Sequence, residues 1–168
     1  MGLYAIRVTS GNLAGLTGSS VTFTSGSTGR LVGGMARCSG VDPVTMVAGH
    51  SPTYPGTILT QGRRAEDFAI SGPCLQISIG ANENTGSNSA TPTTTPSGHT
   101  LALATSTGTG LPSSRTSLHV YERTWEAAGT TADADFAWVA ASGQGAQSVA
   151  LLGAEEAEPE PAPERDGQ

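Results

Sequence analysis

Apolar and polar side chains alternate with a period of two in the last third of the chain. Between residues 115 and 125, Leu118 and Val120 share one parity, whereas His119 and Tyr121 share the other. Two further runs of this kind lie at residues 136–141 and 149–152. Because successive side chains of a strand point to opposite faces, the pattern predicts three strands joined by turns. One face is expected on a core and the other toward solvent or a second layer.

Short runs rich in β-branched and aromatic residues predict further strands along the rest of the chain. They lie at residues 3–8, 21–24, 30–38, 57–60, 68–70, 73–79 and 99–105. In the last of these, Leu101 and Leu103 are expected to face inward. Turn residues (Gly, Pro, Ser and Asn) separate the runs at roughly ten-residue spacing. We therefore expect an all-β domain over residues 1–153, an antiparallel β-sandwich of about eight or nine strands with jelly-roll or Greek-key-like connections.

Two stretches interrupt this pattern. Pro43, Pro52 and Pro55 confine any strand between residues 40 and 64 to an edge or an end, because proline cannot donate to a ladder. The polar stretch 82–98 shows no strand pattern, and loops of this length are often functional or disordered. We expect it to face outward or toward a partner.

The net charge of −6 is concentrated at the C-terminal end. Residues 155–168 hold six acidic side chains and one Arg, hence −5, which leaves −1 for the rest of the chain. A near-neutral body without a basic stripe argues against nucleic acid as a partner. No apolar run reaches the about 18 residues of a spanning helix, and no charged-then-apolar leader opens the sequence. We expect a soluble protein without membrane contact, made in the cytoplasm.

The acidic tail, residues 154–168, has too few apolar side chains to fold by itself. Its prolines favour extended, polyproline-like conformations. Two interpretations stay open: a solubilising tail, or an arm that becomes ordered on a neighbouring subunit. In the second, the contacts are expected from Glu155, Glu156, Glu158 and Glu160.

The sequence offers little chemistry, and we expect no catalytic residues, no cofactor and no metal. Gly49-His50-Ser51 partly matches a nucleophile elbow, but the Gly needed two residues after the serine is Thr53. Asp133 and Asp135 form the tightest pair of carboxylates. Asx turns and solvation explain them better than weak calcium binding, because calcium takes six to eight ligands.

Cys38 and Cys74 lie in apolar runs 36 residues apart and are expected to be buried thiols, with a bridge between neighbouring strands as the alternative. No zinc-binding spacing accompanies them.

Large aromatic residues suggest both a core and a surface platform. Trp138 shares its parity with Phe136, which favours a core position for both rings. Trp125 lies at a strand end beside a glutamate and is a better candidate for an exposed ring. With Tyr54, it is the suspected platform for stacking on a sugar.

Four sequence elements follow one another in the C-terminal half of the chain. They are TPSG at residues 95–98, LHVYER at 118–123, FAW at 136–138 and SVALL at 148–152. In this order they resemble a β-sandwich domain widespread among structural proteins of tailed bacteriophages, including phages of actinobacteria. His99 stands where a Trp is common in that family. The resemblance implies a role in virion assembly, in head decoration or in tails and fibres, and it implies no chemistry.

The leading hypothesis is a non-enzymatic capsid decoration or minor capsid protein, located on the virion surface. Its partners would be the major capsid protein, other virion proteins and further copies of itself. Many weak copies docked across capsomer junctions would bind by avidity and oppose shell expansion. The suspected contacts are the acidic tail and the N-terminal Leu3, Tyr4 and Ile6. The alternative is a tail, baseplate or fibre protein that binds host glycan through Trp125 or Tyr54.

Overall fold

The computed structural model describes residues 34, 38–52, 56–59, 62–84, 92–107, 115–138 and 143–154. Within these residues the chain is all-β and contains no helix, which confirms the all-β part of the predicted fold. Every pairing between the named strands is antiparallel. The strands predicted at residues 3–8 and 21–24, and most of the one at 30–38, lie outside the described residues.

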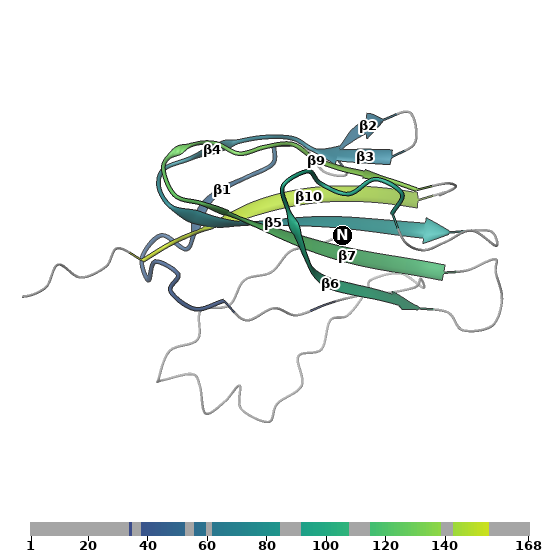
Figure 1. Ribbon diagram of the computed structural model, residues 1–168, viewed down its shortest axis with the longest axis horizontal. Helices are drawn as coiled ribbons and strands as arrows, with labels where there is room; N and C mark the ends of the chain where they lie inside the picture. The colour runs from purple at the N-terminus through teal and green to yellow at the C-terminus, as the bar shows by residue number, and fades with distance from the viewer. Residues whose placement is uncertain are drawn as a thin grey trace, which may run out of the picture.

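Ten strands of the described residues form three sheets (Figure 1). The largest sheet has the order β1-β10-β5-β7-β6, and the smaller ones are β2-β3-β9 and β4-β8. The large sheet consists of β1 (Val47–His50), β5 (Cys74–Asn84), β6 (Thr100–Thr107), β7 (Arg115–Trp125) and β10 (Gly143–Leu152). The smaller sheets consist of β2 (Thr57–Leu59), β3 (Gly62–Ala65), β4 (Ala69–Ile70), β8 (Gly129–Thr130) and β9 (Ala134–Ala137).

The central strand β5 determines what each face of the large sheet carries. Leu75, Ile77, Ile79 and Ala81 point to one face, where Ile79 packs against residues of β7. The alternate positions carry Gln76, Ser78, Gly80 and Asn82. Both faces of the central strands are covered, because residues 117–121 of β7 are buried without exception.

An aromatic cluster joins the three-stranded sheet to the large sheet. Phe136 of β9 and Trp138 just after it are 0% and 1% exposed, which confirms the prediction that both rings are core. Their rings stack with centroids 6.1 Å apart, and Tyr121 of β7 meets Phe136 edge-on at 5.9 Å. Ala65, Ala134 and Ala146 complete the cluster. These contacts set residues of β3 and β9 against β7 and β10.

Strand β5 has a glycine, and so no side chain, where the aromatic cluster contacts it. A Cβ atom added to Gly80 would lie 2.3 Å from Cδ1 of Phe136, far inside the contact distance of two carbon atoms. The Phe136 ring therefore lies directly on the backbone of the central strand. Glycine in a strand interior often marks such a close approach.

We predict that Gly80→Ala destabilises the protein by about 1–3 kcal/mol, because the added methyl group forces the Phe136 ring out of its position. The matched control is Gly129→Ala, since a Cβ atom at Gly129 meets nothing within 4 Å. Urea unfolding of both variants measures the difference. Equal unfolding midpoints for the two alanine variants would contradict this packing.

The prediction that Leu101 faces inward is wrong. Leu101 is 51% exposed, whereas Leu103 packs against the buried cluster of β5 and β7. The register of β6 against β7 shifts between these residues: Leu101 pairs with Tyr121, and Leu103 with the adjacent Val120. This bulge places the two leucines on opposite faces.

Part of the polar stretch 82–98, for which no strand was predicted, is paired with neighbouring strands. Residues 82–84 continue β5, paired with β7 and in part with β10, and Thr94 forms an isolated bridge with Ala137 at the end of β9. Two strands that the sequence pattern did not predict, β1 and β3, begin within the stretch 40–64. Both are four residues long, and their apolar content is low.

Candidate functional site

Polar side chains fill much of the sheet face that the aromatic cluster covers. We call these buried residues the polar row: Gln76, Ser78, Asn82, Ser117, His119 and Ser148. They occupy the strand positions that alternate with the apolar face. Because burying a polar group is costly unless it is hydrogen-bonded, the bonds within this row decide what the row does.

One part of the polar row is fully connected. The amide of Gln76 donates from Nε2 to the Ala132 carbonyl oxygen at 3.2 Å, and its Oε1 accepts from Nε1 of Trp125 at 2.9 Å. Ser78 and Ser148 share a hydrogen bond of 2.8 Å between their Oγ atoms. These bonds connect β5 to β7, to β10 and to the segment that leads into β9.

Among the described residues, Ser78 and His99 form an arrangement that has the parts of a nucleophile and its base. Oγ of Ser78 lies 3.2 Å from Nε2 of His99, and Nδ1 of His99 lies 3.1 Å from the Ser97 carbonyl oxygen. Burial, and then the charge of Arg123, lower the pKa of His99, and the Ser97 carbonyl partly opposes them. However, Ser78 is 0% exposed and also bonded to Ser148, so no substrate reaches its hydroxyl group in this conformation. The pair is a structural contact between β5 and the residue before β6.

Ser51 is also held in a structural contact. It is 2% exposed, and its Oγ accepts a hydrogen bond from the backbone N–H of Ser148 at 3.1 Å. Its own N–H donates to the Ser148 carbonyl oxygen at 2.9 Å. The serine therefore extends the pairing of β1 with β10 by one residue.

Two members of the polar row carry unsatisfied atoms. Asn82 is 1% exposed and His119 is 5% exposed. Within the part of the chain that the structure describes, neither the amide nitrogen and oxygen of Asn82 nor Nδ1 of His119 has a hydrogen-bond partner. Each such buried group costs about 1–3 kcal/mol of stability. Burial also lowers the pKa of His119, because the low-dielectric interior disfavours the imidazolium ion.

We predict that acid destabilises the protein partly through His119. The unfolded imidazole takes up a proton near its usual pKa of 6.5, while the folded one resists protonation. The free energy of unfolding therefore falls as the pH drops below this value, by up to about 1.4 kcal/mol per pH unit for one such group, until the folded pKa is reached.

The measurement is urea unfolding of His119→Gln and of the natural chain at several pH values. The variant should lose less stability on acidification. Some loss of stability on acidification should remain in this variant. His99 contributes in the same direction, because its pKa is also lowered. His50→Gln, at an exposed position of β1, is the control for loss of an imidazole. An unchanged pH dependence in His119→Gln would refute the assignment.

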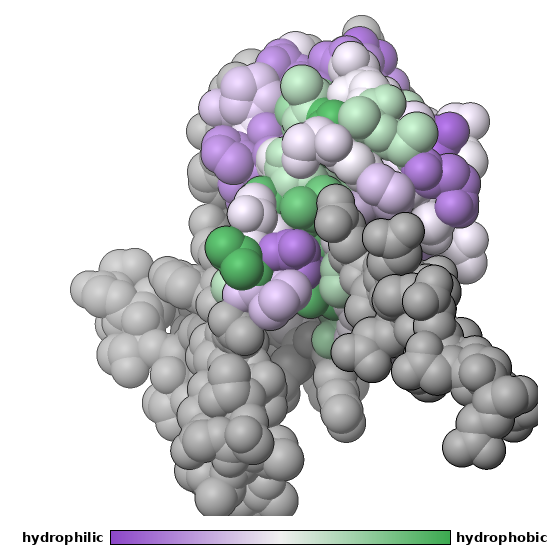
Figure 2. Space-filling model, turned by 90° about the vertical axis from the view of Figure 1, so that its left-hand side faces the viewer, coloured by the Kyte–Doolittle hydropathy of each residue, from purple (hydrophilic) through white to green (hydrophobic). Residues whose placement is uncertain are grey.

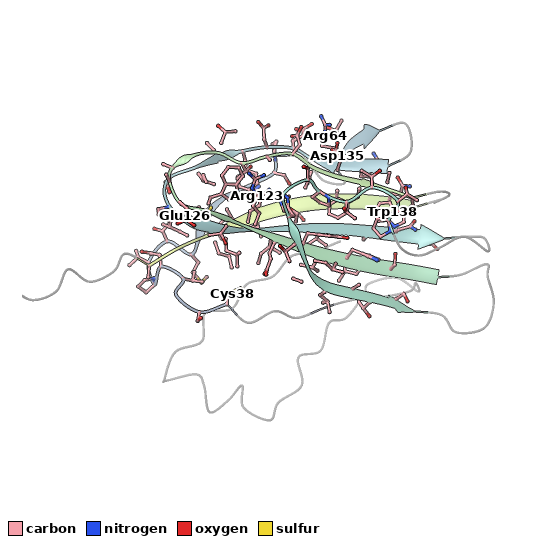
Figure 3. The ribbon with its side chains drawn as sticks, in the orientation of Figure 1. Cys38, Arg64, Arg123, Glu126, Asp135 and Trp138 are labelled. Atoms are coloured by element: carbon pink, nitrogen blue, oxygen red, sulfur yellow. The ribbon has the colours of Figure 1, made fainter. Side chains whose placement is uncertain are left out.

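Asp133 and Asp135 converge on a single guanidinium group, that of Arg64. Nε and Nη2 of Arg64 donate to the two carboxylate oxygens of Asp135 at 2.6 and 2.8 Å, and Nη1 lies 3.0 Å from Asp133 (Figure 3). The hydrogen bonds to Asp135 raise the pKa of Arg64 above its usual value. The second oxygen of Asp133 accepts from the Asp67 backbone N–H at 2.9 Å. Both carboxylates thus connect β3 with β9 and with the loop before β9. This is a structural role, different from calcium binding.

We predict a coupling energy of about 0.5–1 kcal/mol between Arg64 and Asp135, because the pair is bidentate but roughly a third exposed. A double-mutant cycle of Arg64→Ala and Asp135→Ala, followed by urea unfolding, measures it. Arg63 is the matched control, since it is opposite Phe136 in the register and its Nη1 lies 3.4 Å from the Gly56 carbonyl oxygen. The effects of the Arg63 and Asp135 substitutions on the free energy of unfolding should be additive.

Trp125 is half-buried and has three contacts. Its Nε1 donates to Gln76, its ring packs against the cluster around Cys74, and the guanidinium of Arg123 lies 4.3 Å from the ring centroid. One ring face is therefore occupied by a cation. Tyr54, the other member of the suspected glycan platform, lies outside the described residues.

The two cysteines are free thiols. Cys74 is buried, as predicted, and Cys38 is half-buried. Burial raises the pKa of both, and the charge of Glu122 adds to the effect at Cys38. Cys38 and Glu122 border a cavity of about 270 Å³ on the apolar face, over Ile77 and Val120. Raised pKa values keep both groups protonated and poorly nucleophilic at neutral pH.

The two ends of the described body lie side by side. Val41 bridges to Gly153, the Asp42 N–H donates to the Leu152 carbonyl, and the Ala154 N–H donates to the Gly40 carbonyl, the last two at 2.8 Å. The suspected contact residues at the termini lie outside the described residues: Leu3, Tyr4, Ile6, Glu155, Glu156, Glu158 and Glu160.

Exposed apolar surface accompanies these adjoining ends. Val44, three residues after the bridge at Val41, is 90% exposed. Viewed from the left-hand side of Figure 1, apolar side chains appear between polar ones on the surface (Figure 2). This end therefore combines an apolar contact point with the start of both terminal segments.

The described residues contain no group of three or more His, Cys, Asp or Glu side chains placed to hold a metal ion. They also include no helix long and apolar enough to cross a membrane. This chain matches no protein-family model, and no curated protein and no solved structure is significantly similar to it.

Proposed function

We propose that this chain is a non-enzymatic structural protein of a tailed-phage virion that binds the outside of the capsid shell and stabilises it. The observation that carries the proposal is the hydrogen-bonded meeting of residues 40–42 with residues 152–154. Both terminal segments start from this point. Two segments of opposite character, one apolar in part and one acidic, would thus contact neighbouring subunits from a single anchor.

The body suits a passive role because several of its polar side chains bond to other parts of the body. Gln76 donates to the Ala132 carbonyl oxygen, Ser78 bonds to Ser148, and Arg64 pairs with two carboxylates. We further propose that the small sheets form the second layer of a β-sandwich over the polar row. Such a body would lie across capsomer junctions as a rigid unit, and its many copies would bind by avidity even where each contact is weak.

The first test is the copy number of the protein in purified virions, measured by quantitative mass spectrometry. We expect hundreds of copies, in a fixed ratio to the major capsid protein. A handful of copies would place the chain in the tail and make glycan binding the better hypothesis, to be tested with Trp125→Ala. Absence from the particle would contradict both roles.

A variant carrying Gln in place of Glu155, Glu156, Glu158 and Glu160 isolates the contribution of the acidic tail. Particles lacking the natural protein should bind this variant more weakly at low salt and with less dependence on salt, because fewer ionic contacts form. The control is Glu122→Gln with Glu126→Gln, which removes two exposed charges from the body and should leave binding unchanged.

A further inference from the structure

Strand β6 forms one edge of the five-stranded sheet, and no described strand pairs with its outer side. Among the described strands its partner is β7, from Thr100 to Thr107 (Figure 1). An antiparallel strand that is paired on one side directs alternate N–H and C=O groups away from the sheet. Such an edge is a template for another extended segment.

The sequence of β6 lacks the charged residues and prolines that often protect an edge. TLALATST contains no charged residue and no proline, the devices that discourage strand addition. The opposite edge, β1, is only four residues long and is bulged between Val47 and Gly49. Beyond its own bulge, β6 keeps a regular register from Leu103 to Thr107. Of the two edges, β6 is therefore the one that can accept a full strand.

Several side chains on β6 are accessible. Ala102, Ala104 and Ser106 are exposed, and Leu101 is 51% exposed, one of three large apolar residues that are exposed within the described residues. An added strand would cover this surface as well as the backbone groups. Its side chains would meet no charged neighbour on β6.

We propose that the occupant is a second copy of this chain, with β6 pairing antiparallel to β6 about a two-fold axis at Ala104. Two five-stranded sheets then become one continuous sheet, and the symmetric contact closes without leading to a fibre. Ala104 faces its own counterpart in this register, and Leu103 faces Thr105. These uncharged pairs place no like charges opposite each other, which would destabilise the sheet. The inference stands apart from the virion role, since it depends only on β6.

The experiment is sedimentation velocity of the full chain over a series of concentrations. The natural chain should dimerise. Ala104→Lys and Ala104→Glu should each shift the equilibrium at least about tenfold toward monomer, because two like charges would face each other at the axis. An equimolar mixture of these two variants should recover a dimer, since opposite charges then meet.

Ala128→Lys, in an exposed turn, is the matched control and should dimerise like the natural chain. Urea unfolding shows that each variant is folded. A dimer that persists in both Ala104 variants would place the interface elsewhere and overturn the proposal. A monomer at all concentrations would also overturn it, and amide hydrogen exchange would then identify the cause. Slow exchange at residues 103–107 would mean that a segment of the same chain covers β6, and fast exchange would mean an open edge.

Discussion

The contact between the Phe136 ring and the bare backbone of Gly80 determines how the rest of the described structure fits together. It lets β9 approach the large sheet closely, and the stacked Trp138 and edge-on Tyr121 fill the space around it. Once β9 is held there, Asp135 meets Arg64 on β3, and the Ala132 carbonyl reaches Gln76. The ion pair and the polar hydrogen bonds therefore join the same segments that the aromatic contact holds together.

The polar row then defines how the covering segments are oriented. A purely apolar interior tolerates many packings, whereas buried amides and hydroxyl groups are satisfied in few. Gln76 is such a group, because its bonds to Trp125 and Ala132 fix two segments relative to β5. The amide of Asn82 and Nδ1 of His119, which have no partner among the described residues, subtract from the stability that the same interior provides. Members of one row thus act in opposite directions on the stability of one sheet face.

Local alternation was enough to predict the all-β class, a strand where β7 lies, and the core positions of Phe136 and Trp138. It failed where the period changes, at the bulge that turns Leu101 outward. It also missed β1 and β3, which are short and carry little apolar signal. The pairing of Arg64 with Asp135 links residues 71 positions apart. The Ser78–His99 contact joins β5 to the residue before β6. Contacts of this kind depend on strand order, which no local pattern contains.

The adjoining ends of the body have a mechanical consequence. Because residues 40–42 and 152–154 are joined by antiparallel pairing at one end of the sheet, a force that separates the two terminal segments loads these hydrogen bonds one after another. Hydrogen bonds that are loaded one at a time also break one at a time, so the pairing opens under a small force. A force that pulls both segments in the same direction loads them together and leaves the pairing intact. A protein attached through both segments to one moving surface would therefore follow that surface as a unit, whereas attachment to two diverging surfaces would open it from β1 and β10 inward.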